Sequence, residues 1–238
     1  MRNYIYLFLL LSALGIESIM ATDPSITNYA KLVDTKIGTE GHGLGCGFTF
    51  IGAAYPFGMM QITPAFFSPQ KGIVINQMSG AGCPHMGNFP ILPIAGELNS
   101  SPNNMEGYPR YETVNTSTAG YLAITMKDGT KCQTTVSKRS GIMKFIFSEK
   151  ESKGTVIIGA GIGSTSLSNA QIKITSPYTC EGYAEGGEIC GYSANYKIYF
   201  AAEFNSQAIA YGTWINSDLK KDRLQIGGKN SGAYFTFD

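Results

Sequence analysis

The sequence predicts an all-β fold, an antiparallel β-sandwich of the large, supersandwich-like type with long glycine-rich loops. From Ala119 onward, short runs of alternating apolar and polar residues recur at intervals of roughly ten residues, as they do in sandwiches and barrels. No segment with a 3.6-residue apolar period is long enough for a large helix. The chain also contains 29 glycines and 12% aromatic residues, which suits many tight turns between strands.

The first half of the chain is less regular than the second. Ile26–Ile37 is predicted to form a short helix or a turn. Strands are expected at Phe48–Ile51 and Met59–Thr63, on either side of a turn at Pro56–Gly58. The next stretch, Gly72–Leu98, begins as a strand-like run, continues as a polar loop with glycines, and ends in an apolar run that two prolines stiffen.

Steady alternation makes the second half easier to assign. Turns are predicted at Lys127–Gly129, Glu185–Gly187 and Ile226–Gly228, where glycines separate the alternating runs. The strands expected between such turns are Tyr121–Lys127, Lys131–Val136, Met143–Phe147, Thr155–Gly159, Gln171–Thr175, Tyr196–Phe204, Ala208–Trp214 and Ala233–Phe237.

The first residues are typical of an export signal. Arg2 supplies a positive start, Ile5–Leu11 is a short apolar run, and Ile19–Ala21 is an imperfect cleavage site. Residues 1–21 are therefore predicted to be a signal peptide and residues 22–238 a single exported domain, periplasmic or secreted. The apolar run is too short to span a bilayer.

The charge balance excludes some classes of partner. The formal net charge is +1, from 18 basic and 17 acidic residues, and neither sign forms a long run. Nucleic acid and anionic membranes are therefore not expected as partners.

The polar loop within Gly72–Leu98 is the first candidate for a binding site. Gly80 and Gly82 let the backbone turn sharply and approach a ligand without a Cβ atom in the way. Loops of small polar residues on a rigid scaffold commonly bind ligands, and a tight surface crossover is the alternative. Glycines at 41, 43, 45 and 47 predict a second loop of the same kind.

Export permits disulfides, and the five cysteines include at least one without a partner in the chain. Cys180 and Cys190 bracket a polar segment that is expected to be a hairpin loop, so they are the predicted pair. The alternative is that they are two free thiols on neighbouring strands. The pairing of Cys46, Cys83 and Cys132 stays open.

Three other motifs in the sequence have simpler interpretations. Gly159–Ser164 lacks the third glycine of a dinucleotide loop and is predicted to be a turn between strands. Ser79 lacks the context of a nucleophile elbow. A zinc site of His42, Cys46, Cys83 and His85 is possible by ligand type but matches no zinc spacing, so no metal site is predicted.

Glycoside hydrolysis requires two carboxylic groups that flank the scissile bond. Near the two loops the acidic residues are Glu40 and Glu97, and neither has a visible acidic partner. No cluster of acidic and amide residues predicts calcium binding either. The chain is thus expected to shape a substrate site without any catalytic residue of its own.

The order of the segments resembles the N-terminal domain of glycoside hydrolase family 92, the calcium-dependent exo-α-mannosidases. The resemblance spans nearly the whole mature chain. It depends on two motifs in a fixed order, VD..IGT…TF.GA..PFGM followed by SG.GC…P, and this pairing is specific. The matching residues are Val33-Asp34, Ile37-Gly38-Thr39, Gly41-His42-Gly43, Thr49-Phe50-Ile51-Gly52-Ala53, Pro56-Phe57-Gly58-Met59-Met60-Gln61, Pro64, Ser79-Gly80-Ala81-Gly82-Cys83, Gly87-Asn88, Pro93, Gly96, Gly120-Tyr121, Asp128-Gly129 and Tyr196–Phe204.

The resemblance implies an N-terminal sandwich packed on a C-terminal helical (α/α)6 barrel, with the active site between them. It implies that the barrel, which this chain lacks, supplies the catalytic acid, the base and most calcium ligands. By the same resemblance, Phe50, Ser79, Gly82 and Cys83, with Gly80 beside them, would lie near the terminal mannose of a glycan. Gln77, Met78, His85 and Asn88 would border the leaving group.

The resemblance therefore implies part of an inverting α-mannosidase that acts on mannose-containing glycans, truncated before its barrel and inactive alone. The chain departs from the family pattern at Leu44–Gly47, which looks like an insertion, at Ile51, which replaces a proline, and at Ile75–Met78. A stand-alone carbohydrate-binding sandwich and a small exported metal-binding protein are the alternatives.

Overall fold

The structure of the chain is a computed structural model, and it divides into two compact units, Met1–Leu32 and Val33–Asp238. In the first unit, the described residues form the 3-10 helix η1, Tyr29–Leu32. None of the described segments is a helix long and apolar enough to cross a membrane. The predicted signal peptide lies outside the described residues, which are 29–39, 47–66, 70–78, 80, 82–108 and 111–238.

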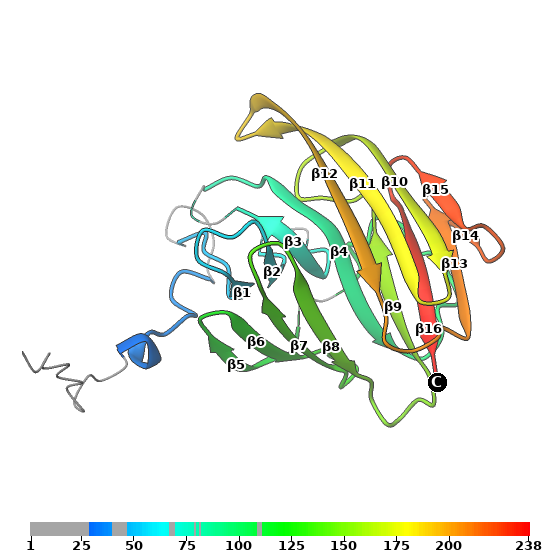
Figure 1. The fold of residues 1–238 in the computed structure, drawn as a ribbon, viewed down its shortest axis with the longest axis horizontal. Helices are drawn as coiled ribbons and strands as arrows, with labels where there is room; N and C mark the ends of the chain where they lie inside the picture. Colours follow the sequence, from blue (N-terminus) through cyan, green and yellow to red (C-terminus); the bar gives the residue numbers. More distant parts are fainter. Residues whose placement is uncertain (1–28, 40–46, 67–69, 79, 81, 109–110) are drawn as a thin grey trace, which may run out of the picture. The chain divides into compact units, whose positions relative to one another are not determined.

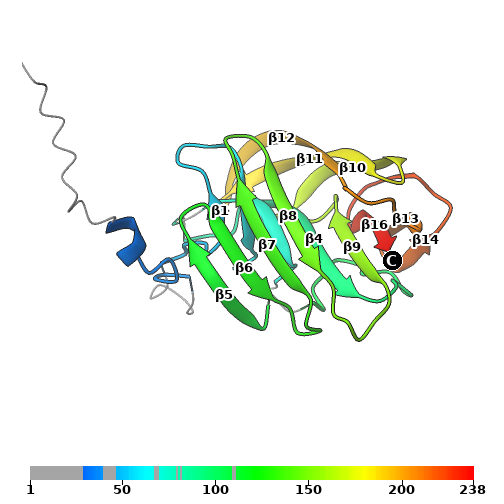
Figure 2. The ribbon, with the colours of Figure 1, turned by 60° about the horizontal axis from the view of Figure 1, so that its bottom comes forward.

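The second unit is built from three sheets whose strand pairs are all antiparallel, so the all-β sandwich prediction is confirmed. Figure 1 and Figure 2 show the sheets from two sides. The central sheet has the order β1 (Ala53–Ala54), β2 (Gln61–Pro64), β3 (Ile73–Gln77), β4 (Met86–Ala95), β9 (Gly154–Gly159), β16 (Ser231–Phe237), β13 (Ala210–Ile215) and β14 (Asp218–Lys220). The second sheet has the order β12 (Tyr192–Glu203), β11 (Thr179–Ile189), β10 (Leu167–Ser176) and β15 (Gln225–Gly227), and the third β5 (Thr113–Thr118), β6 (Tyr121–Thr125), β7 (Lys131–Val136) and β8 (Gly141–Ile146).

The central sheet is buried on both faces in its middle. Every residue of β9 is buried, and successive side chains alternate between two cores. Ile157 packs in a core with Leu122 of the third sheet, whereas Val156 and Ile158 pack in a core with Ile172 of the second sheet. The continuous apolar run of β9 reflects this double burial, since a strand covered on both faces has no polar side.

The strands of the outer sheets have one face exposed to solvent and one face buried. Along β7, Cys132 and Thr134 are buried while Lys131 and Thr135 are exposed, so the alternation that predicted this strand is the alternation of its two faces. The bounds predicted for β7 are confirmed to the residue. The other strands predicted in the second half are present with ends shifted by up to four residues.

Several expectations about the backbone are wrong. Phe48–Ile51 is irregular, and the first strand pair is formed by Ala53–Ala54 with β2. The apolar exit of the polar loop within Gly72–Leu98 is the long strand β4. The strands β5, β11, β14 and β15 were not predicted. The predicted turn at Glu185–Gly187 lies inside β11. The turn predicted at Ile226–Gly228 falls largely on β15, and the chain turns just after that strand.

The strand β4 accommodates Pro90 because its ladder with β3 is interrupted there. Ile73 of β3 pairs with Ile91, but Ile75 pairs with Asn88, so β4 has an extra residue between these pairs. Phe89 has a φ of 50° at this bulge, and Pro90 follows it. A bulge leaves a residue without a ladder partner, so the missing N–H of proline costs little there.

Candidate functional site

Phe48, which follows the glycine-rich stretch Gly41–Gly47 (the first segment), contacts the polar loop within Gly72–Leu98 (the second segment). The backbone N–H of Gly80 donates a hydrogen bond of 2.6 Å to the carbonyl of Phe48. Gly82 faces the Phe48 ring so closely that a Cβ atom built on it would lie 3.9 Å from the ring. Gly80 and Gly82 have φ angles of 75° and 74°, which favour glycine.

The predicted substrate residues divide into an exposed group and a buried group. Met78, Gly80 and Gly82 are exposed, and Phe50 and Cys83 are partly exposed. Gln77, His85 and Asn88 are buried, with at most 1% of their surface exposed. Ser79, His42 and Cys46 lie outside the described residues.

Gln77 anchors the second segment to the connection between β9 and β10. Its Nε2 donates to Ser164 Oγ at 2.8 Å, and its Oε1 accepts the backbone N–H of Phe66 at 3.3 Å. The backbone N–H of Ser164 donates in turn to the Met86 carbonyl at 2.9 Å. A buried amide that is satisfied in this way fixes the loop that precedes β4.

Asn88 forms the second anchor, through Tyr196 on β12. The Asn88 amide and the Tyr196 hydroxyl lie 3.2–3.3 Å apart, with Nδ2 and Oδ1 both within hydrogen-bond distance. Burial raises the pKa of Tyr196 above its ordinary value, so the phenol stays protonated at neutral pH.

His85 is buried and fixed by its own turn. Its Nδ1 lies 3.0 Å from the Cys83 carbonyl, which can only accept, so Nδ1 carries the proton. Its Nε2 is buried and has no hydrogen-bond partner among the described residues.

The predicted disulfide between Cys180 and Cys190 is wrong, because Cys190 pairs with Cys83 across 107 residues of sequence. Cys180 and Cys190 lie at opposite ends of the extended strand β11, roughly 30 Å apart at the rise of a strand. The turn of the hairpin is Cys190-Gly191, where φ angles of 52° and 81° form the tight two-residue loop between β11 and β12. Cys180 and Cys132 are buried free thiols, and burial raises the pKa of each to about 12.

The disulfide argues against a zinc site at these residues. Ligand atoms of Cys83, His85 and Cys190 lie within 4.8 Å of one another. However, zinc binds cysteine as the thiolate, and here the two sulfur atoms are bonded to each other. Elsewhere in the described part of the chain, no acidic residues gather in a way that would hold calcium.

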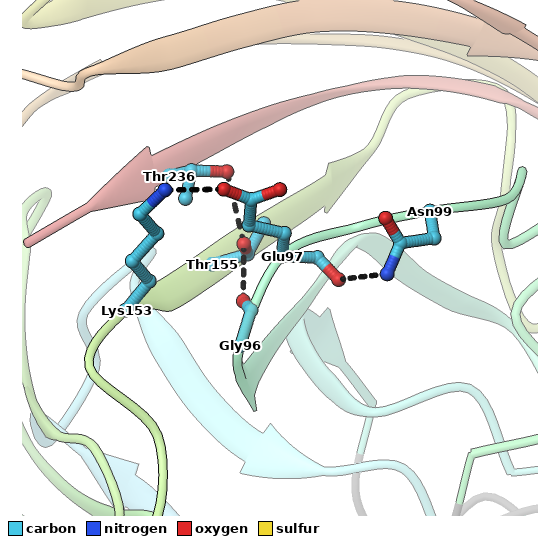
Figure 3. A network of polar contacts seen from close by, with 6 residues as sticks. All are labelled: Gly96, Glu97, Asn99, Lys153, Thr155 and Thr236. Carbon is cyan, nitrogen blue, oxygen red and sulfur yellow. Dashed lines mark hydrogen bonds and ion pairs between the residues drawn. The ribbon is translucent and has the colours of Figure 1, made fainter.

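Glu97 belongs to a structural network at the end of β4. Lys153 Nζ donates to Glu97 Oε1 at 2.5 Å, and this bond and the lysine charge lower the pKa of the carboxyl. Thr155 donates to the Gly96 carbonyl at 2.7 Å, and its hydroxyl lies 3.0 Å from that of Thr236 (Figure 3). A general acid of a glycosidase needs a raised pKa, so Glu97 is unsuited to that role. Glu40 lies outside the described residues.

A cavity of about 500 Å³ opens beside the disulfide. Cys83 and Cys190 form part of its wall, and the connection between β9 and β10 forms another part. The Gly159–Ser164 segment begins at the last residue of β9 and continues into this connection, which joins two strands without a helix, so the prediction of a turn between strands is confirmed. The charged residues that line the cavity are Lys71, Glu188 and Lys229.

Sequence reasoning missed the residues that position the second segment from elsewhere in the chain. Ser164 and Tyr196 are 87 and 108 residues from their partners, Gln77 and Asn88. The sequence indicated this role only in that Gln77 and Asn88 are polar residues beside apolar runs, and these runs form the strands β3 and β4.

The comparisons with known proteins agree with this architecture. The family model described as the glycosyl hydrolase family 92 N-terminal domain matches residues 32–238. None of the curated proteins that were compared with the chain matches it.

Solved structures of family GH92 share the fold. An α-mannosidase of Bacteroides thetaiotaomicron, BT3965, superposes with a TM-score of 0.74 at 22% identity, over 89% of this chain and 31% of that one. The inverting mannosidase BT2199 from Bacteroides thetaiotaomicron VPI-5482 gives a TM-score of 0.71 at 22% identity, over 88% of this chain and 29% of that one. The glycosyl hydrolase ccman5 gives 0.71 at 20% identity, over 89% and 31%. The chain thus spans about a third of the length of these solved relatives.

Proposed function

Because the chain belongs to the glycosyl hydrolase family 92 N-terminal domain family, as its match over residues 32–238 shows, we propose that it forms the substrate pocket of an α-mannosidase. The enzyme would hydrolyse terminal α-mannosides of glycans with inversion, and a C-terminal (α/α)6 barrel would supply the acid, the base and calcium. This chain alone would be inactive. The family match is the observation that carries the proposal.

Two further observations support it. BT3965 has also been solved in complex with mannoimidazole, and that structure gives a TM-score of 0.75 with this chain at 22% identity, over 89% of this chain and 31% of that one. In this chain, the hydrogen bond from Gly80 to Phe48 brings the two glycine-rich segments together, so that one ligand could touch both.

The burial pattern assigns different tasks to the predicted substrate residues. We expect Phe50, Met78, Gly80 and Gly82 to touch the sugar, since they are exposed or partly exposed. Ser79 would join them. Cys83 is tied into the disulfide and would form the pocket wall.

The buried Gln77, His85 and Asn88 would position the loop instead of touching the leaving group. The Cys83–Cys190 disulfide agrees with the proposal that the chain is exported, because disulfides persist outside the cytosol.

The test is hydrolysis of 4-nitrophenyl α-mannoside by the chain alone and by the chain joined to a family 92 C-terminal barrel. We expect no turnover by the chain alone and turnover by the joined protein, which a calcium chelator abolishes. Proton NMR of the first product should show β-mannose, as inversion requires. Hydrolysis by the chain alone, or α-mannose as the first product, would contradict the proposal.

A matched pair of variants tests the pocket assignment. Met78→Ala in the joined protein should lower kcat/KM about five- to tenfold, because roughly 1 kcal/mol of apolar contact with the sugar is lost. Met59→Ala removes a similarly exposed methionine outside the two segments and should leave kcat/KM unchanged. If the chain binds mannose-containing glycans with equal affinity with and without the barrel, and no joined form hydrolyses them, it is a carbohydrate-binding sandwich instead.

A further inference from the structure

The connection between β9 and β10 lines the cavity and contains backbone N–H groups that could serve as hydrogen-bond donors. No hydrogen bond from the backbone N–H groups of Gly163, Thr165 and Ser166 is found among the described residues, although Gly163 is buried. Buried N–H groups normally have a partner. This segment is the glycine-containing motif that fails as a dinucleotide loop, and its donors remain without an assigned role.

Ser164 adds a hydroxyl donor. The amide nitrogen of Gln77 can only donate, so Ser164 Oγ accepts in the 2.8 Å bond between them. The hydroxyl proton of Ser164 is therefore available to another acceptor, and Ser164 lines the cavity.

Two lysines flank the same connection. Lys71 Nζ donates to the Gly163 carbonyl at 3.2 Å and lies 3.8 Å from a Glu106 carboxylate oxygen. On the other side, the Asn230 N–H donates to the Gly161 carbonyl at 3.0 Å, which places Lys229 beside the connection. Lys229 has no carboxylate within 4.0 Å among the described residues.

The charge of the cavity lining is positive. The lining contains two basic residues, Lys71 and Lys229, and one acidic residue, Glu188. Cationic side chains, a hydroxyl and backbone N–H groups together are the donors that bind phosphate in proteins. A cavity of about 500 Å³ is larger than a phosphate ion and falls within the range of small-molecule sites.

We propose that this cavity binds the phosphate group of a small ligand, with Lys229, Lys71, the Ser164 hydroxyl and the backbone N–H groups of Gly163, Thr165 and Ser166 as donors. The phosphate would be carried by a sugar or another small alcohol, which the remaining volume would hold. The proposal does not depend on mannosidase activity, because binding is measured on this chain alone.

The experiment is isothermal titration of the chain with glucose 6-phosphate, inorganic phosphate and glucose. We expect glucose 6-phosphate to bind most tightly, inorganic phosphate more weakly and glucose not at all. The affinity should fall as the NaCl concentration rises from 50 to 300 mM, because the contacts are between opposite charges. Equal affinity for the first two would show that free phosphate is the ligand and would overturn the phosphate-ester part of the proposal.

Variants locate the site. Lys229→Met should weaken glucose 6-phosphate binding about tenfold, since one charge-assisted hydrogen bond is lost. Lys173→Met is the matched control, because Lys173 is exposed on β10 roughly 20 Å along the strand from Leu167, and it should bind like the unchanged chain. Lys229 is itself exposed, so its replacement should not unfold the chain. Equal losses in the two variants, or glucose 6-phosphate bound no more tightly than glucose, would overturn the proposal.

Discussion

The Cys83–Cys190 disulfide should contribute strongly to stability, and the double variant Cys83→Ser/Cys190→Ser tests this. The bridge joins residues 107 apart in sequence, so it restricts a long segment of the unfolded chain. The chain-entropy relation gives about 4.7 kcal/mol for a loop of about 100 residues, and native disulfides contribute about 2–5 kcal/mol. A protein of this size loses about 2–4 °C in Tm for each kcal/mol, so the variant should melt about 5–15 °C lower.

Calorimetry with and without a dithiol reductant measures this effect. The unchanged chain and a Cys180→Ala variant should both lose stability in reductant, because each keeps the Cys83–Cys190 bond. The double variant should melt at the same temperature in both conditions. Non-reducing peptide mapping should find a peptide linked through Cys83 and Cys190. A linked Cys180–Cys190 peptide, or a double variant as stable as the unchanged chain, would refute this reasoning.

Three further predictions concern single contacts. NMR titration should show a Glu97 pKa below the ordinary carboxyl range, and the pKa should return toward that range in Lys153→Met. A pKa lowered by folding stabilises the fold at pH values above the pKa of the unfolded chain. This stabilisation should disappear as the pH falls through the pKa of the folded chain. Native Cys132 should resist iodoacetamide at pH 9 and react on unfolding, because with a pKa of about 12 only about a thousandth of it is thiolate. Tyr196→Phe should destabilise the fold by about 1–3 kcal/mol in urea unfolding by leaving Asn88 buried without a partner, and a double-mutant cycle with Asn88→Ala should show coupling of at least about 0.5 kcal/mol.

The sequence predicted strands correctly where one face of the strand is exposed to solvent and the other is buried. Lys131–Val136 alternates visibly, and its bounds were predicted to the residue. It failed at β11, where glycines suggested a turn. In the structure, Gly182 and Gly186 are covered by the Phe200 and Tyr196 rings of β12, so a Cβ atom at either position would collide with a ring. Glycine there makes room for a neighbouring strand, and the sequence of β11 alone cannot show that neighbour.

The same limit applies to the candidate site. The sequence identified the glycine-containing loop and its polar residues, because glycine and small polar side chains mark loops directly. It did not show which of those residues face solvent. Gln77 and Asn88 became internal anchors because Ser164 and Tyr196, far away in sequence, lie against them. The partner of Cys190 was hidden for the same reason.

The positions of the carboxylates bear on which part of the proposed enzyme would cleave the glycosidic bond. A glycosidase needs an acid with a raised pKa and a second carboxylate about 5–10 Å away. Within the described part of the chain, Glu97 has a lowered pKa and is held by Lys153, and Glu188 is the one acid that lines the cavity. One exposed glutamate cannot serve as both groups of the reaction. The exposed backbone of Gly80 and Gly82 is suited to contacting a substrate, and in the proposed mannosidase the C-terminal barrel would supply the carboxylates for bond cleavage.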